Sequence, residues 1–187
     1  DEAGLHEYLR TRPGNKAAVM AERSDAAAKA RAKTTLSSRY TKPYIAHASI
    51  GPSCALARID GKRIEVWSHS QGVYQLRYDL ATVLEMPLED IIVHHAEGSG
   101  CYGHNGADDV ALDAVLLSRA AGGRPVQVQW MRDEEFAWEP YSPAMTTDVK
   151  AALDDKGNIV DWSVEVWSNG HSQRPNSVKT PAPVSSL

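Results

Sequence analysis

A glycine-rich segment between a short apolar run and an amphipathic stretch is the part of the sequence best suited to chemistry. Residues 91–112 read IIVHHAEGSGCYGHNGADDVAL, with Gly98, Gly100, Gly103 and Gly106 in the middle. Glycines carry no side chain, so a cofactor can approach the backbone and receive hydrogen bonds from its N–H groups. The start of the helix expected after the loop adds a partial positive charge. The segment therefore predicts a site for an anionic or electron-rich group.

The glycine spacing alone leaves several interpretations open. Gly98, Gly100 and Gly103 match the G-x-G-x-x-G pattern of dinucleotide-binding folds. The acidic residue expected about 20 positions further on is missing, because that stretch reads SRAAGG. A tight structural turn would also use such glycines. A Rossmann-like nucleotide-binding domain and a non-catalytic interaction module therefore stay as alternatives to a cofactor site.

The histidines do not predict a metal site. His94 and His95 are adjacent on an expected strand, so their side chains point to opposite faces and cannot bind one ion together. His47, His69 and His104 each stand alone in the sequence, and no HxH, HxxxH or HExxH pair occurs. We therefore expect no metal ligands, although His104 keeps functional interest because it lies inside the glycine loop.

Cysteines and acidic residues add little chemistry. The two cysteines, Cys54 and Cys101, form no CxxC pair, which argues against a disulfide framework, an iron–sulfur cluster or a structural zinc site. Asp108 and Asp109 lie at the start of the helix expected after the loop, where their negative charges interact favourably with the positive end of the helix dipole. No Ser/His/Asp arrangement follows from the spacing.

Two amphipathic helices are expected to hold the loop. One apolar stripe predicts a helix over 72–85. A second helix is expected over 108–121, with Asn105 or Asp108 as its cap and Gly122-Gly123 at its end.

Alternating and short apolar runs predict the strands. The 54–68 hairpin is expected to turn at Asp60-Gly61, with Cys54, Leu56 and Ile59 facing the core. Together the predicted strands are 34–44, 54–59, 63–67, 91–93, 126–130, 148–153 and 159–167.

Strands and helices mix without strict βα alternation, so we expect an α+β fold. Its predicted architecture is a two-layer mixed sheet with helices packed on one face. Residues 1–33 are expected to be an N-terminal linker with a short helix over 25–33 capped by Ser24, residues 34–175 the domain, and 176–187 a disordered tail.

Composition sets wider limits. The chain has 187 residues, of which 42% are apolar and 24% charged, and its net charge is -4. These values are ordinary for one globular domain and do not suit a nucleic-acid binder, which usually carries a basic face. No apolar run approaches the roughly 18–20 residues of a membrane span. The chain starts without Met and ends in a segment without a hydrophobic period, so we expect a piece of a longer polypeptide.

Beyond these patterns, the stretch SQGVYQLRYDLATVLEMPLEDIIVHHAEGSGCYG resembles a known family. It is similar to the molybdopterin-binding large subunit of molybdenum hydroxylases of the xanthine dehydrogenase and aldehyde oxidase type. Ser70-Gln71 resembles the family's Thr/Ser-Gln step into a helix, MPLEDIIV its strand entry, and SGCYG its G-G-G-F-G loop. The similarity has no gap from Gln71 to Gly103 and extends over about residues 26–173. The sequence segments CYGHNGADD and WEPYSPAM are most similar to the nicotinate/isoquinoline oxidoreductase branch of this family.

The resemblance implies a site. Gln71 matches the glutamine that hydrogen-bonds an oxygen ligand of molybdenum, and Gly100, Cys101, Tyr102 and Gly103 match the loop that lies against the metal centre and the pterin. The implied cofactor, in a complete subunit, is molybdenum bound to molybdopterin. Three departures concern substrate contacts: Gly106 replaces a residue that is often acidic, Gly51 stands at the glutamate of an M-E-P pattern, and Cys101 replaces a glycine.

The resemblance also implies a function. The chain is expected to be a fragment of the catalytic subunit of an oxidoreductase that hydroxylates an N-heteroaromatic or aldehyde substrate with oxygen from water. The family's catalytic glutamate lies in a C-terminal G-x-G-E segment that is absent here, so the chain alone is expected to be inactive. Implied partners are the remainder of the large subunit, an electron-transfer subunit or domain with iron–sulfur clusters or a cytochrome, and a small-molecule substrate. Nucleic acid is not expected, and the expected location is the bacterial cytoplasm or periplasm.

Overall fold

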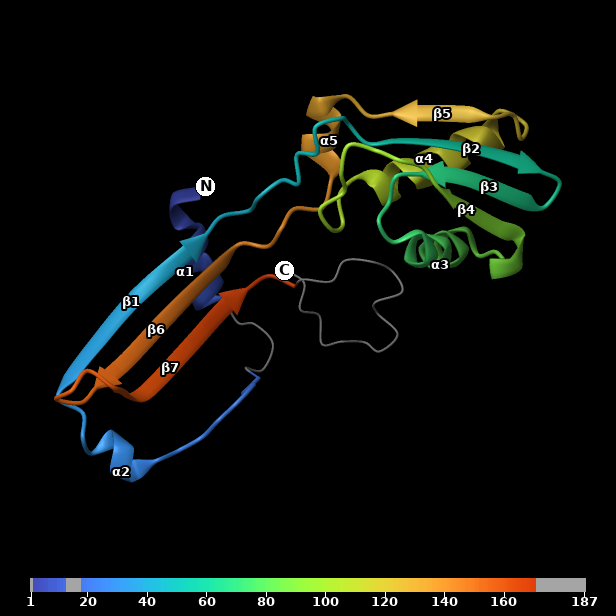
Figure 1. Cartoon of the computed structure of the whole chain (residues 1–187). Coiled ribbons are helices and arrows are strands. Elements are labelled where there is room, and N and C mark those ends of the chain that lie inside the picture. Colours follow the sequence, from blue (N-terminus) through green and yellow to red (C-terminus); the bar gives the residue numbers. More distant parts are fainter. Residues whose placement is uncertain (1, 13–17, 171–187) are drawn as a thin grey trace. The chain divides into compact units, whose positions relative to one another are not determined.

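The computed structural model describes residues 2–12 and 18–170, whose contacts divide into two compact units (Figure 1). The three-stranded unit comprises the described residues up to Tyr44 and from Pro143 onward, and the four-stranded unit comprises Ile45–Ser142. The predicted limits of a 34–175 domain stay a prediction, and the tail expected at 176–187 lies outside the described residues. No helix in the described ranges is long and apolar enough to cross a membrane.

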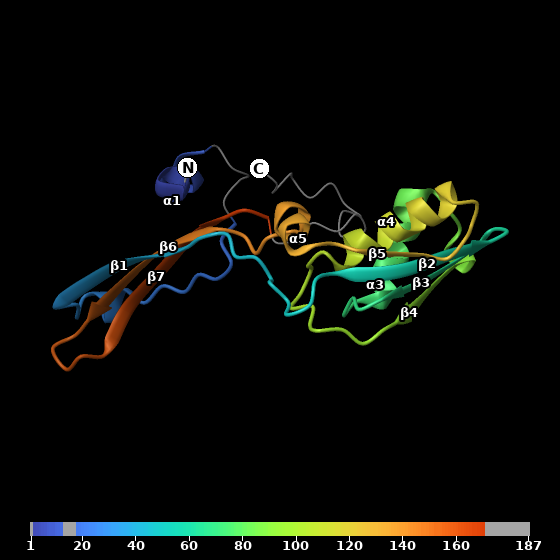
Figure 2. The ribbon, with the colours of Figure 1, turned by 90° about the horizontal axis from the view of Figure 1, so that it is seen from above.

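The three-stranded unit is an antiparallel sheet in the order β1-β6-β7. Helix α1 packs on one side of this sheet, mainly against β6 (Figure 2). The elements are α1 (Glu2–Thr11), α2 (Ala26–Lys29), β1 (Thr34–Lys42), β6 (Met145–Leu153) and β7 (Ile159–Ser168). The strands confirm the extended segment and the second hairpin expected from the sequence.

The N-terminal helices correct the sequence prediction. Helix α1 was not expected within residues 1–33, because its sequence lacks apolar density. The helix is instead stabilised by tertiary contacts: Arg10 lies 3.6 Å from Asp148 and 4.9 Å from the ring centre of Trp167. Helix α2 is shorter than the predicted 25–33, and its cap is Asp25, not Ser24, because the Asp25 carboxylate accepts a hydrogen bond from the Ala28 N–H at 2.9 Å.

The four-stranded unit contains a mixed sheet in the order β4-β3-β2-β5. The β3–β4 pair is parallel, and β2 is antiparallel to both β3 and β5. This arrangement confirms the predicted α+β class, and a Rossmann-like fold is not supported because β3–β4 is the single parallel pair among the described strands. The elements are β2 (Cys54–Asp60), β3 (Arg63–Ser68), α3 (Val73–Leu84), η1 (Leu88–Asp90), β4 (Ile91–His95), α4 (Ala107–Ala120), β5 (Val126–Gln129) and α5 (Arg132–Trp138).

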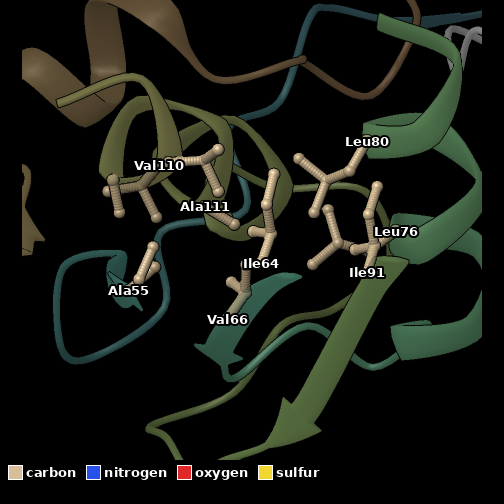
Figure 3. Packing of buried hydrophobic residues seen from close by; sticks show 11 residues of the cluster. Ala55, Ile64, Val66, Leu76, Leu80, Ile91, Val110 and Ala111 are labelled. Carbon is tan, nitrogen blue, oxygen red and sulfur yellow. The ribbon is translucent and has the colours of Figure 1, made fainter. Parts of the chain in front are cut away.

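Helices α3 and α4 cover one face of this sheet and bury the core with it (Figure 3). The predicted inward side chains Ile64 and Val66 of β3 are buried there. On β2 the expectation for Cys54 and Leu56 was wrong. The fully buried residues are Ala55 and Ala57, which lie beneath α4. Small side chains at these positions allow the helix to approach the strand closely.

The connections of the four-stranded sheet meet at one edge. Because β3 and β4 are parallel and β2 is antiparallel to β3, the ends of β3 and β4 lie at the same edge as the start of β2. The end of β5 lies there too, since Cys54 pairs with Gln129. Four segments therefore gather at this edge: residues 45–53, 69–72, 96–106 and 130–139.

Candidate functional site

The backbone of the loop between β4 and α4 explains two of its glycines. Gly100 and Gly103 have φ values of +113° and +110°, a region that L side chains rarely adopt. A Cβ on Gly100 would also lie 2.6 Å from the ring of Tyr102. A Cβ on Gly103 would meet Nε2 of His47 at 3.6 Å, an ordinary van der Waals distance, so a small side chain there would not clash with the described residues beyond its two chain neighbours. Tyr102 itself has a φ of +59°, and its side chain is 62% exposed.

The other two glycines of the loop serve packing. A Cβ on Gly98 would lie 2.5 Å from the Cβ of His69, and one on Gly106 would lie 2.7 Å from the ring of Trp130. Gly98 and Gly106 therefore allow close packing of neighbouring side chains without a left-handed backbone, while Gly100 and Gly103 have the positive φ values that a tight turn uses.

The thiol of Cys101 and the amide of Asn105 tie the loop to the start of α4. Cys101 is buried, and its Sγ–H donates to the carbonyl of Gly103 at 2.9 Å and contacts Oδ1 of Asn105 at 3.3 Å. The same Oδ1 accepts from the N–H of Ala107, the first residue of α4, at 3.0 Å. The N-cap of α4 is Gly106, so the prediction of Asn105 or Asp108 as the cap was wrong: Asn105 precedes the N-cap, and Asp108 lies inside the helix. Because Oδ1 of Asn105 faces a backbone donor, the Nδ2 group is fixed on the other side, where it is buried without a partner among the described residues.

Helix α5 holds the segment 45–53, which precedes β2, through two of its side chains. Glu135 is fully buried and accepts from the Ser53 N–H at 2.5 Å, and it pairs with Arg132 at 2.6 Å. Arg132 also donates to the carbonyls of Ser49 and Ile50. Neither α5 nor the roles of Arg132 and Glu135 were predicted from the sequence. The one feature that could have indicated them is the spacing of an Arg and a Glu three positions apart.

Gly51 completes the contact between that segment and the loop. Its N–H donates to Oγ of Ser99 at 2.6 Å, and a Cβ there would lie 2.7 Å from the same oxygen. The departure from the family's glutamate at this position therefore fits the close approach of the two segments.

Gln71 lies in segment 69–72 of this edge, which forms the turn between β3 and α3. Ser70 is buried, and its Oγ accepts from the N–H of Gly72 at 3.2 Å, which fixes the turn. The Gln71 side chain is exposed and has no hydrogen bond to any residue of the described ranges. Parallel pairing of β3 and β4 brings Gln71 and the loop to one edge of the sheet, but the structure gives no contact between Gln71 and Gly100 to Gly103.

A pocket of about 280 Å³ lies between this turn, the loop and β2. His69 lines it together with Gly98, Ser99 and Trp67. Burial lowers the pKa of His69, which favours the neutral imidazole. Both ring nitrogens are buried without a hydrogen-bond partner.

Several buried polar atoms around the loop have no partner in the described parts of the chain. They are Ser53 Oγ, His47 Nδ1, both nitrogens of His69, Asn105 Nδ2 and Glu139 Oε2. Buried polar groups in folded proteins are almost always hydrogen-bonded, so such a concentration indicates a ligand or ordered water. Within the described ranges, no three His, Cys, Asp or Glu side chains come together as a metal site.

A family model of the molybdopterin cofactor-binding domain matches residues 8–183. The chain belongs to this family. Membership confirms the resemblance seen in the sequence, together with the fold and the cofactor that it implied.

Two curated relatives agree with this result. The nicotinate dehydrogenase of Pseudomonas putida has a subunit that is 46% identical over 143 residues, which make up 75% of this chain and 12% of that protein. The aldehyde oxidoreductase molybdenum-binding subunit PaoC of Escherichia coli is 30% identical over 138 residues, or 73% of this chain and 19% of that protein. The chain therefore spans less than a fifth of the length of either relative.

Solved structures share the fold. Quinoline 2-oxidoreductase from Pseudomonas putida 86 matches with a TM-score of 0.65 at 20% identity, over 75% of this chain and 18% of that chain. Aldehyde oxidoreductase from Desulfovibrio gigas matches with a TM-score of 0.61 at 20% identity, over 73% of this chain and 15% of that chain.

The residues at the sheet edge fit the family's cofactor. No side chain covers the backbone at Gly103, and Asn105 Nδ2 and Ser53 Oγ are buried groups without a hydrogen-bond partner among the described residues. A polar, ring-shaped cofactor with anionic groups needs both features.

Proposed function

We propose that this chain is part of the catalytic large subunit of a molybdenum-dependent hydroxylase, in which residues 100–103 seat the cofactor. The observation that carries the proposal is the left-handed backbone at Gly100, Tyr102 and Gly103, in a loop of a chain that matches the molybdopterin cofactor-binding domain.

The proposed reaction converts a C–H bond and water into C–OH, two protons and two electrons. When bound, the molybdenum cofactor supplies the two-electron redox chemistry. The electrons pass to an iron–sulfur or cytochrome partner, in a separate subunit or domain, and the remainder of the large subunit supplies the other walls of the site. By itself the 187-residue chain is expected to be inactive.

Residues of this chain have three roles in the proposal. The amide of Gln71 would help to hold the bound cofactor by donating a hydrogen bond to it. The backbone of Gly100 and Gly103 allows close approach, and the thiol of Cys101 holds the loop in that shape. The exposed ring of Tyr102 is available to contact the cofactor or the substrate.

The proposed substrate class is an N-heteroaromatic ring. It rests on the 46% identity to a protein named for nicotinate, against 30% to a protein named for aldehydes. The alternative is an aldehyde. Turnover of nicotinate and benzaldehyde by the complete subunit with its partners separates the two classes.

Substitution of Gly103 by valine in the complete subunit tests the cofactor site. A β-branched side chain would cover the backbone of the loop beside His47 and cannot adopt a φ of +110° without strain. We expect Gly103→Val to lose most of its bound molybdenum per folded molecule. Elemental analysis measures the molybdenum content in samples of the variant whose melting curve shows that the protein is folded.

Gly122→Val is the matched control. Gly122 also has a positive φ, +72°, but nothing lies within 4 Å of its Cβ position, and it follows α4 at the other end of the helix. The control should lower stability and leave molybdenum per folded molecule unchanged. Full molybdenum occupancy in folded Gly103→Val would refute the site.

A further inference from the structure

We infer that Ser99, Arg132 and Glu135 are positioning residues, which hold the loop that is proposed to seat the cofactor against the segment before β2. The inference rests on the proposed function of residues 100–103 and adds the contacts that keep their backbone in place. None of the three residues has a role in the function proposed above. Each acts through hydrogen bonds to other parts of the chain, not through contact with the cofactor.

The loop depends on outside support because its own backbone pairs little. Residues 97–103 take part in no backbone–backbone hydrogen bond within the described ranges. Two of them, Gly100 and Gly103, are glycines, and glycine loses more conformational freedom on folding than any other residue. The Cys101 thiol bonds inside the loop, whereas the Ser99 hydroxyl bonds outside it. The left-handed backbone of the proposed site therefore rests on few contacts, of which Ser99 supplies the one to a distant segment.

Ser99 and Gly51 form a reciprocal contact. The Gly51 N–H donates to Oγ of Ser99 at 2.6 Å, and the same hydroxyl group donates to the carbonyl of Gly51 at 3.1 Å. A Cβ on Gly51 would lie 2.7 Å from this oxygen, although the φ of Gly51 is not in the left-handed region. The absence of a side chain at Gly51 is therefore explained by the approach of Ser99 and not by backbone conformation.

A buried ion pair of α5 fixes the turn 49–53, which contains Gly51. One carboxylate oxygen of Glu135 accepts from Arg132 at 2.6 Å, and the other accepts from the Ser53 N–H at 2.5 Å. Arg132 also donates to the carbonyls of the first two residues of the turn, at 2.5 and 2.8 Å. The pair thus holds both ends of the turn, and Glu135 is fully buried.

The contacts run in series from α5 to the turn and from the turn to the loop. The guanidinium group of Arg132 bonds a carboxylate with one nitrogen and two carbonyls with another, which suits its planar fork. A lysine would keep the charge beside Glu135 but could not reproduce this set of bonds. A change at Arg132 should therefore reach the loop through the contact between Gly51 and Ser99.

The test is amide hydrogen exchange of the complete subunit, measured by mass spectrometry on peptides that cover 49–53 and 97–103. Ser99→Ala removes the hydroxyl group and keeps the Cβ. We expect exchange of residues 97–103 to become about 3- to 10-fold faster, the effect of losing about one hydrogen bond. Molybdenum release from the folded protein should accelerate as well. Ser37→Ala, an exposed serine of β1, is the control and should change neither rate.

Gly51→Ala probes the same contact without deleting a polar group. Its Cβ would push Ser99 away, so exchange of residues 97–103 should again become faster. In the double variant Gly51→Ala/Ser99→Ala the hydroxyl group is gone, and the loop should exchange no faster than in the faster of the two single variants. This non-additivity identifies the contact as the cause.

Arg132→Lys tests the series arrangement and avoids leaving Glu135 as a buried charge without a cation nearby. We expect faster exchange in both 49–53 and 97–103. In the background of Ser99→Ala, the same substitution should still affect the turn but add nothing to the exchange of the loop. If Arg132→Lys does not fold, the variants of Ser99 and Gly51 decide the inference.

Three results would overturn the inference: unchanged exchange of residues 97–103 in Ser99→Ala, additive effects of Arg132→Lys and Ser99→Ala on the loop, or faster exchange in Ser99→Ala with molybdenum release at the wild-type rate. The last result would mean that the contact orders the loop without positioning it for the cofactor. The proposed function fails separately, if folded Gly103→Val keeps its molybdenum. The hydrogen-exchange results do not depend on that outcome.

Discussion

Gln71 is an exposed amide for which packing and capping offer no explanation. It precedes α3, but the turn is fixed by Ser70 and Gly72, and the Gln71 side chain forms no hydrogen bond within the described ranges. We expect Gln71→Ala in the complete enzyme to lower turnover by about 10- to 1,000-fold, the effect of removing one preorganised donor. Folding stability should change by about 1 kcal/mol or less, since the side chain is exposed.

Steady-state kinetics and thermal unfolding of the same samples check this prediction. Gln129→Ala on β5 is the control, because Gln129 is also an exposed glutamine of the four-stranded unit. Wild-type turnover in a molybdenum-loaded Gln71→Ala enzyme would remove Gln71 from the site.

At the scale of single residues, the sequence predicts the structure at positions where the backbone conformation requires glycine. The glycine pattern predicted a loop open to a ligand, and Gly100 and Gly103 have the conformation that requires glycine. The pattern could not distinguish them from Gly98 and Gly106, whose neighbours His69 and Trp130 come from other segments. The burial of the acids Glu135 and Glu139 was not predictable either, because the backbone N–H groups that they accept from lie more than 80 residues away in the chain.

At the scale of elements, periodicity predicts correctly when the buried face is made of large side chains. Leu76 and Leu80 fix the face of α3, and Ile64 and Val66 that of β3. On β2 the larger residue, Leu56, points away from the core, because α4 packs on Ala55 and Ala57. Hydrophobic size is then a misleading guide, since close helix packing selects small residues.

The start of α4 is the element on which the loop depends most. Asn105 precedes its N-cap, Gly106, and accepts hydrogen bonds from the Ala107 N–H and from the Cys101 thiol. We expect Asn105→Ala to lower the free energy of unfolding by about 1–2 kcal/mol, because the Ala107 N–H would be left buried without its acceptor. Urea unfolding followed by circular dichroism measures this loss.

The cap of α2 supplies a comparison for that experiment. Asp25→Ala removes the same kind of hydrogen bond, but α2 has four residues and none of them is buried. Its loss should therefore be a few tenths of a kcal/mol, near the bottom of the capping range. Equal effects of the two substitutions would mean that the Asn105 network does not support α4.

At the scale of the whole molecule, the three-stranded sheet has two unlike faces. The register places Leu36 beside Ala151 and Trp162, and Tyr40 beside Thr147 and Val166, on one face. Lys42, beside Met145 at one end, is the charged side chain on the rows of this face from Leu36 to Lys42, and the large apolar residues of the face are exposed, with Trp162 at 56%. Helix α1 contacts the opposite face, where Arg10 meets Asp148 and Trp167.

An exposed apolar face of this kind does not suit a free monomer in water. The matched part makes up 12% of the length of the nicotinate dehydrogenase relative, and under the proposed function the remainder of the large subunit covers this face.

Without that cover, we expect the 187-residue chain to self-associate at micromolar concentration. A charge at the centre of the face, as in Trp162→Lys, should oppose association, because burying an unpaired ammonium group is costly. Sedimentation velocity of both proteins measures the effect, with Ser163→Lys on the opposite face of β7 as the charge-matched control. A monomeric wild-type chain, or equal association of the two lysine variants, would show that this face drives no contact. If Trp162→Lys alone becomes monomeric, the same substitution in the complete subunit should instead lower its melting temperature, because there the lysine would be buried against the rest of the subunit.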